Sequence, residues 1–180
     1  MVKILDIFKV ASWNLKGIPP KVAAGGTKID MAGFNAPMVL PGTYTIKLTV
    51  KDKVFESKIN CVHDNENPDL TVSDRKAVYD NAMKLQNLHA NVNQLIDSVS
   101  MYQAQLKKDT LVFNKNKAFK LFHSDLEKIR AELMGTKNKS IFADEERIRE
   151  KVSALYATFC SMEAKPNIIQ LEAIDVLIAE

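Results

Sequence analysis

The longest periodic pattern in this chain runs from Ser73 to Lys108. Alternating steps of four and three residues meet mostly apolar side chains, at Val78, Ala82, Leu85, His89, Val92, Ile96, Val99, Gln103 and Leu106. Residues at this spacing share one side of an α-helix. The pattern therefore predicts a helix about 54 Å long, at 1.5 Å per residue, that packs against partner helices along its whole length.

Three later segments supply such partners. Their apolar residues repeat the same spacing and are Phe119, Phe122, Leu126, Ile129 and Leu133; then Ile148, Val152, Leu155, Phe159 and Met162; then Leu171, Ile174 and Ile178. Gly135 ends the first segment, Asp144 is placed to cap the second, and Pro166 precedes the third. We expect residues 73–180 to form an antiparallel bundle of three to four helices.

The residues before the long helix have the alternation of β-strands. In Tyr44, Ile46, Leu48 and Val50 the apolar side chains fall on one face, and a turn at residues 51–53 leads to Phe55, Ser57, Ile59 and Cys61. Ala11, Trp13 and Leu15 alternate in the same way, whereas residues 17–41 are rich in Pro and Gly and predict loop. A lone hairpin is marginal in water, so we expect it to pack on the Trp13 strand.

These patterns divide the chain into a small antiparallel β portion over residues 1–64, a linker over residues 65–72 and the helical bundle over residues 73–180. Thr71 or Ser73 can cap the long helix, and Thr71, followed three residues later by Asp74, has the spacing of a capping box. The predicted fold class is therefore α+β.

Charge and composition argue against several classes of partner. The 25 basic and 22 acidic residues give a net charge of +3, which does not favour nucleic acid. The chain has no apolar run of the roughly 18 residues needed for membrane insertion, and Asp6 and Lys9 interrupt any signal-peptide core. We expect either a cytoplasmic protein or a natural N-terminus that lies further upstream. Cys61 and Cys160 are predicted to be buried thiols.

The residues able to carry chemistry each have a structural interpretation that we favour. His89 and Gln103 lie on the apolar seam, where hydrogen bonds across the bundle would satisfy them. The acidic stretch 63–69 lacks the spacing of a calcium loop, and Asp144, Glu145 and Glu146 suit the start of a helix. Asn138, Lys139 and Ser140 form a glycosylation sequon, which is a weak signal.

Five lysines surround the turn after the long helix: Lys107, Lys108, Lys115, Lys117 and Lys120. Asp109 interrupts them and no aromatic stacking platform is interleaved, so we expect a solvated surface there rather than a site for nucleic acid or membrane headgroups. No catalytic motif is present, and we predict no catalytic residue, no cofactor and no metal site. A second apolar stripe, formed by Leu88, Leu95 and Tyr102, is the interaction surface that the sequence offers.

The hairpin carries a family resemblance. The order of Ser12-Trp13-Asn14-Leu15-Lys16, a Pro- and Gly-rich loop, Leu40 to Val50, Lys53-Val54-Phe55 and Ile59 to Asp64 resembles the C-terminal region of bacterial sortilin-like, BNR-repeat β-propeller proteins labelled glycosyl hydrolases. In that family an Ig-like β-sandwich follows the propeller and a helical region follows the sandwich. Lys16 stands where the family has Arg, and the turn lacks the Gly that is common there.

This resemblance implies an Ig-like β-sandwich portion, incomplete in this chain, and a non-catalytic C-terminal structural or interaction module of a secreted or periplasmic propeller protein. Its partner would be its own missing N-terminal propeller domain or, through homo-oligomerisation, a second copy. One alternative is part of a glycoside hydrolase whose active site lies in the absent propeller. A second is a carbohydrate-binding module, with Trp13, Tyr44 and Phe55 as a stacking platform, although alternation predicts that these rings face inward.

Overall fold

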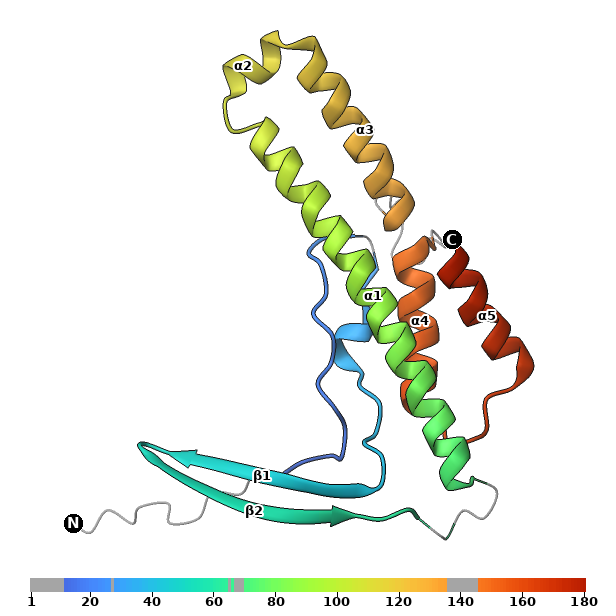
Figure 1. The fold of residues 1–180 in the computed structure, drawn as a ribbon. Coiled ribbons are helices and arrows are strands. Elements are labelled where there is room, and N and C mark those ends of the chain that lie inside the picture. The colour runs from blue at the N-terminus through green and yellow to red at the C-terminus, as the bar shows by residue number, and fades with distance from the viewer. Residues whose placement is uncertain (1–11, 27, 65, 67–69, 136–145) are drawn as a thin grey trace, which may run out of the picture.

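The computed structural model describes residues 12–26, 28–64, 66, 70–135 and 146–180. The fold is α+β, as the sequence predicts (Figure 1). Its elements are the 3-10 helix η1 (Met31–Phe34), the strands β1 (Gly42–Val50) and β2 (Lys53–Cys61), and the helices α1 (Val72–Leu106), α2 (Thr110–Lys115), α3 (Lys117–Leu133), α4 (Ile148–Ser161) and α5 (Ile168–Ala179).

Helix α1 is the spine of the molecule. It begins at Val72, one residue before the predicted Ser73, and Thr71 is its N-cap. The Thr71 hydroxyl accepts a hydrogen bond from the Asp74 backbone N–H at 3.1 Å, and the Asp74 carboxylate accepts one from the Thr71 N–H at 3.2 Å. The seam predicted from the spacing is buried from Val78 to Val99. No helix in the described part of the chain has both the length and the apolar composition needed to cross a bilayer.

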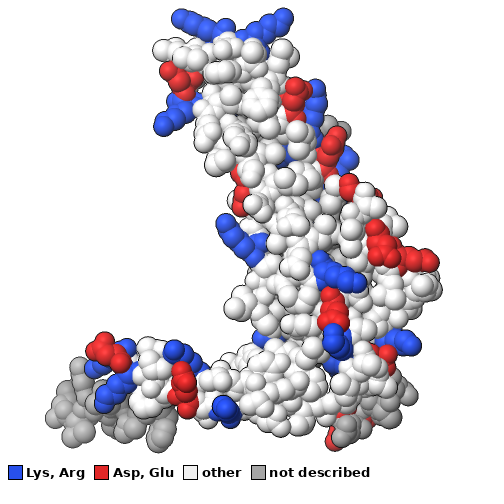
Figure 2. All heavy atoms as spheres, viewed as in Figure 1, with Lys and Arg blue, Asp and Glu red and all other residues white. Residues whose placement is uncertain are grey.

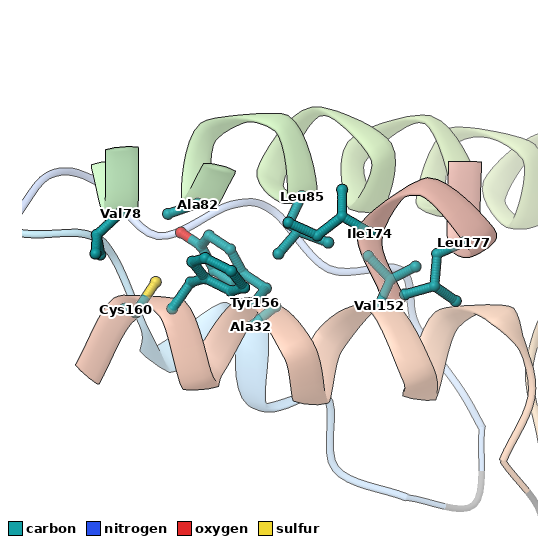
Figure 3. Packing of buried hydrophobic residues seen from close by; sticks show 10 residues of the cluster. Ala32, Val78, Ala82, Leu85, Val152, Tyr156, Cys160, Ile174 and Leu177 are labelled. Atoms are coloured by element: carbon teal, nitrogen blue, oxygen red, sulfur yellow. The ribbon is translucent and has the colours of Figure 1, made fainter. Parts of the chain in front are cut away.

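The partner helices divide the length of α1 between them. Helices α4 and α5 pack on its first half, where they share a core made of Val78, Ala82, Leu85, Val152, Tyr156, Phe159, Cys160, Ile174 and Leu177 (Figure 3). A second core lies further along α1, where Val92 and Ile96 meet Leu133 and Met134. Helices α3 and α4 thus lie one after the other along α1, and only α3 accompanies its final turns (Figure 1).

Residues 16–26 and 28–37, the N-terminal strap, lie against α1 and α4 rather than against the sheet (Figure 1). Ala23, Ala32 and Ala36 are buried, and η1 contacts α4. Small side chains allow this extended backbone to lie close to the helices. The loop predicted here is confirmed apart from the single turn of η1, but it belongs to the helical core.

The predicted hairpin is confirmed. Gly42 to Val50 pair with Cys61 to Lys53 in antiparallel register, and Lys51 and Asp52 make the turn, so that Lys53 belongs to β2 rather than to the turn. The predicted strand at Trp13 is wrong within the described residues, because Ser12 to Leu15 form no ladder and Lys16 makes only an isolated bridge with Met38.

The hairpin projects to one side of the helical body (Figure 1). In the described residues the sheet has two strands, whereas a sandwich needs two sheets packed face to face. The structure therefore supports the α+β class and not a sandwich as such. Residues expected in one β portion are divided, because the strap joins the helices and the hairpin stands apart.

Candidate functional site

Two features stand out as candidates for function: a buried polar cluster beneath the strap and the exposed apolar face of the hairpin. The polar cluster is centred on Asp30, which lies just before η1 and caps it by accepting the Ala32 N–H at 3.1 Å. Asp30 Oδ2 lies 2.8 Å from His89 Nε2 on α1, and Asp30 Oδ1 accepts the Ser153 hydroxyl of α4 at 2.7 Å. One carboxylate therefore links the strap to both helices.

The same cluster extends along α1. Asn93 accepts the Ala23 N–H at 2.7 Å and donates to the His89 backbone carbonyl at 2.8 Å. His89 is fully buried, and its side chain is satisfied by Asp30 and Asn93. The interpretation of His89 as an interior histidine with hydrogen-bond partners is confirmed. Gln103 is satisfied by Glu127 at 2.8 Å across the α1–α3 contact.

Arg149 brings a buried positive charge to this cluster, with a side chain that is 1% exposed. Its guanidinium bonds Glu150 at 2.6 Å and donates to the backbone carbonyls of Gly25 at 3.0 Å and Lys28 at 3.3 Å. The Glu150 carboxylate in turn accepts the Gly135 N–H at 3.0 Å. A buried charge without partners is costly. The strap carbonyls therefore stabilise the buried guanidinium of Arg149, and Arg149 fixes the backbone of the strap.

The ionisation of Asp30 follows from this environment. Burial raises the pKa of its carboxyl, but hydrogen bonds from His89 and Ser153, the charge of His89 and the Ala32 N–H outweigh burial and lower the pKa below its ordinary value of 3.8. Asp30 is therefore the ionised acceptor at the centre of the cluster at neutral pH.

Although it contains Ser, His and Asp, the cluster has the wrong order for a nucleophilic triad. In a triad the serine donates to the histidine and the carboxylate orients the histidine from the other side. Here Ser153 donates to Asp30 rather than to His89, so the imidazole is not placed to take the hydroxyl proton, and all three side chains are almost fully buried. The arrangement is structural.

The acidic side chains that line two of the cavities are paired with cations. A cavity of about 130 Å³ beside the cluster holds Asp30, Glu146 and Glu150, and a shallow groove of about 490 Å³ between α4 and α5 carries Glu146 and Glu180. Lys28 lies 3.4 Å from Glu146 and Lys151 lies 2.8 Å from Glu180. Glycoside hydrolysis needs two carboxyl groups facing each other across a substrate, and these acids are engaged by cations instead.

No group of three or more metal-ligating side chains occurs among the residues that the structure describes. Asp64 accepts the Glu66 N–H at 2.9 Å, and His63 lies 2.8 Å from the Leu70 carbonyl, so these linker side chains make local turns. The sequon at 138–140 and the acids Asp144 and Glu145 fall outside the described residues. Cys160 is buried, which raises the pKa of its thiol, and it is not bonded to Cys61.

The predicted stripe of Leu88, Leu95 and Tyr102 is divided by the packing. Leu88 packs against the core that α1 shares with α4 and α5. Leu95 is 54% exposed and Tyr102 is 48% exposed. Two of the three residues are thus available for contact, on the part of α1 that has fewer partner helices.

The apolar face of the hairpin, which alternation placed inward, is the larger exposed surface. Ile46, Leu48, Val50 and Phe55 are each about half exposed. Leu48 lies directly opposite Phe55 in the ladder, so both side chains point to the same face. Among the described residues, the Trp13 ring covers the base of this face, where it meets Tyr44 edge-on with the ring centroids 5.6 Å apart.

The expectation that the three aromatic residues would be buried is also wrong. Trp13 is 42% exposed and Phe55 is 55% exposed, while Tyr44 is half-buried and donates its hydroxyl to the Leu40 carbonyl at 2.6 Å. Alternation reports which side chains share a face, but it contains no information on whether a second layer covers that face. Sequence reasoning missed the position of the strap. Its small residues and Asp30 pack in the groove between α1 and α4 and do not cover the sheet.

Comparison of the chain with known protein families, with characterised proteins and with solved structures returned no significant match.

Proposed function

We propose that this chain is a non-catalytic interaction module that docks through the apolar face of its hairpin. The observation that carries the proposal is the exposure of Ile46, Leu48, Val50 and Phe55 on one face of a two-stranded sheet that projects from the body. A two-stranded hairpin with a bare apolar face is marginally stable in water, so it needs a covering layer.

The composition of the opposite face of the hairpin favours docking through the apolar face alone. This opposite face carries Thr43, Thr45, Lys47 and Thr49 on β1 and Val54, Glu56, Lys58 and Asn60 on β2, so that Val54 is its one apolar residue, and Lys47 and Glu56 form a cross-strand ion pair at 3.8 Å. Polar and charged side chains on one face and aliphatic ones on the other are typical of a sheet that forms one layer of a sandwich. The hairpin is thus suited to be half of a larger β structure.

The resemblance to the C-terminal region of sortilin-like, BNR-repeat propeller proteins suggests what the other half is. In this proposal the hairpin belongs to an Ig-like sandwich completed by the rest of a longer secreted or periplasmic polypeptide, and the propeller domain is the partner.

The first test is the size of the natural protein. An antibody raised against this chain should detect, in the cells that produce it, a polypeptide much larger than 20.2 kDa. In that polypeptide, the amides of β1 and β2 should exchange hydrogen more slowly than in the isolated chain, because the face is covered. A natural product of 20 kDa would contradict the propeller parent.

The second test separates the two faces of the hairpin. Leu48→Asp with Phe55→Asp should remove the added protection in the longer polypeptide, whereas Thr45→Asp with Thr49→Asp, on the polar face, should not. Sedimentation of the isolated chain addresses the other partner: self-association that is abolished by Leu48→Asp with Phe55→Asp would assign the face to a second copy. If Leu95→Asp with Tyr102→Asp abolishes self-association instead, the contact between the two copies lies on the helical stripe.

The exposure of Trp13 and Phe55 supports a carbohydrate-binding module as a second candidate, because exposed rings can stack on sugars. Isothermal titration with neutral oligosaccharides tests this function. Binding that is lost in Trp13→Ala and retained in Tyr79→Ala would support it, and the absence of heat across a panel of sugars would remove it.

A further inference from the structure

The end of the molecule furthest from the hairpin has no core of its own. Helix α1 continues past Val99 into a turn, α2 and the start of α3, forming a distal tip over residues 100–125 (Figure 1). Val99 and Leu126 are buried, but no residue between them is. A segment of this length with no buried side chain gains little from its own packing.

The tip is nevertheless rich in large apolar residues. Its exposed members are Met101, Tyr102, Leu111, Val112, Phe119, Leu121 and Phe122. Leu111 is 72% exposed in a helix of six residues that buries nothing. Leu121 is 57% exposed on the solvent side of α3, since Leu126 and Leu133 mark the side that is packed. These aliphatic side chains point away from the molecule at its end.

The tip carries a net positive charge. Residues 100–125 contain five lysines, at 107, 108, 115, 117 and 120, against Asp109 and Asp125. All five lysines are exposed, and Asp109 is held at the N-terminus of α2, where its carboxylate accepts the Leu111 and Val112 N–H groups at 3.0 Å. Asp125 is paired with Lys128 at 2.8 Å. Figure 2 shows basic side chains at this end, with a few acidic side chains near them and uncharged surface between.

We propose that the distal tip binds the surface of anionic lipid membranes. Lysines attract the acidic headgroups, and the aliphatic side chains among them enter the boundary between headgroups and acyl chains. Nucleic acid fits the tip less well, because phosphate-backbone binding uses the lysines alone, and in the described structure the only ring contact at the tip is the edge-on packing of Phe113 on His123. This proposal revises the expectation that the lysines are only solvated, and it concerns peripheral binding rather than insertion across a bilayer.

The test is flotation of the full chain with vesicles of phosphatidylcholine alone or with about 30% phosphatidylserine. The chain should float with the anionic vesicles only, and raising the salt from about 0.1 M to about 0.5 M should release it. Lys107→Gln with Lys108→Gln and Lys115→Gln should weaken partitioning by about fivefold per lysine. The matched control is Lys47→Gln with Lys58→Gln and Lys84→Gln, three exposed lysines elsewhere, which lowers the net charge equally and should leave flotation unchanged.

A second pair of variants tests the apolar part. Leu111→Gln should weaken flotation, whereas Ile169→Gln on α5, whose exposure of 73% matches the 72% of Leu111, should not. The proposal is overturned if anionic vesicles do not float the chain, or if the two lysine triples have equal effects, which would mean that net charge alone is responsible. Binding of a DNA duplex through the tip lysines without vesicle binding would also overturn it and assign the tip to a phosphate backbone.

Discussion

Asp30 is the residue on which the attachment of the strap depends most. Its carboxylate bonds His89 on α1 and Ser153 on α4, and its side chain is 4% exposed. Removing one member of a buried charged network leaves the other members without a partner.

Asp30→Asn should therefore lower the free energy of unfolding by about 3 kcal/mol. Asp52→Asn, in the exposed hairpin turn, is the control and should change it by less than about 0.5 kcal/mol. Urea denaturation monitored by circular dichroism measures both. Equal stabilities for the two variants would show that the cluster contributes nothing to folding.

The pH dependence of stability follows from the lowered pKa of Asp30. Since the folded-state pKa lies below the ordinary value of 3.8, the unfolded chain takes up the proton first as the pH falls. The stabilisation is complete above pH 3.8 and is lost as the pH falls through the lower, folded-state pKa. Urea denaturation over this acid range should show a steeper loss of stability for the natural chain than for Asp30→Asn.

Gly26 is required by both conformation and space. Its φ is +89°, in the region that favours glycine, and a Cβ at this position would lie 2.3 Å from Arg149 Nη2. Gly26→Ala should lower stability by about 1 to 3 kcal/mol. Gly17→Ala, where the nearest atom to an added Cβ is 3.8 Å away, should be much milder in the same thermal denaturation assay.

The start of α1 shows an element whose boundary local chemistry decides. Thr71→Ala removes the side-chain acceptor for the Asp74 N–H, and a lost N-cap costs about 1 kcal/mol. Ser98→Ala, in the middle of the same helix, removes only a bond from the hydroxyl to the Gln94 carbonyl and should be close to neutral. Thermal denaturation of the two variants compares them. A neutral Thr71→Ala would mean that tertiary contacts alone hold this end.

Helix α3 shows where periodicity is insufficient. The spacing of its apolar residues is correct, yet only Leu126 and Leu133 are buried, while Phe119, Phe122 and Ile129 remain between one third and one half exposed. A stripe of this width needs two neighbouring helices to cover it, and α3 has mainly α1. The pattern predicted the helix and the side that packs, but it contains no information on how many helices pack against that side.

The whole molecule should show a gradient of stability along α1. Its first half is enclosed by α4, α5 and the strap, whereas the part beyond Val99 has no buried residue. We expect native-state hydrogen exchange to be slow for the amides of residues 78–96 and fast for those beyond 100. Leu85→Ala should lower the free energy of opening that hydrogen exchange reports for the first half of α1 and for α4 by about 2 to 5 kcal/mol, and Leu121→Ala should not. Uniform protection along α1 would contradict this division.

The packing of the strap beneath Arg149 and Asp30 was beyond prediction for a simple reason. Ala23, Ala32 and Gly26 carry no periodic signal, and their partners on α1 and α4 are 59 or more residues away in the sequence. His89 and Asn93 indicated that polar partners must approach the seam, but not which segment supplies them.

Local patterns alone were sufficient for the helices, for the cap at Thr71 and for the hairpin with its alternation of faces, because each depends on neighbours within a few residues. The tertiary structure decided which apolar faces are covered. It placed the strap in the groove between α1 and α4, and it left apolar side chains of the hairpin and of the distal tip partly exposed. Burial depends on contacts between distant segments, so the surfaces through which this protein is proposed to act became visible only in the folded chain.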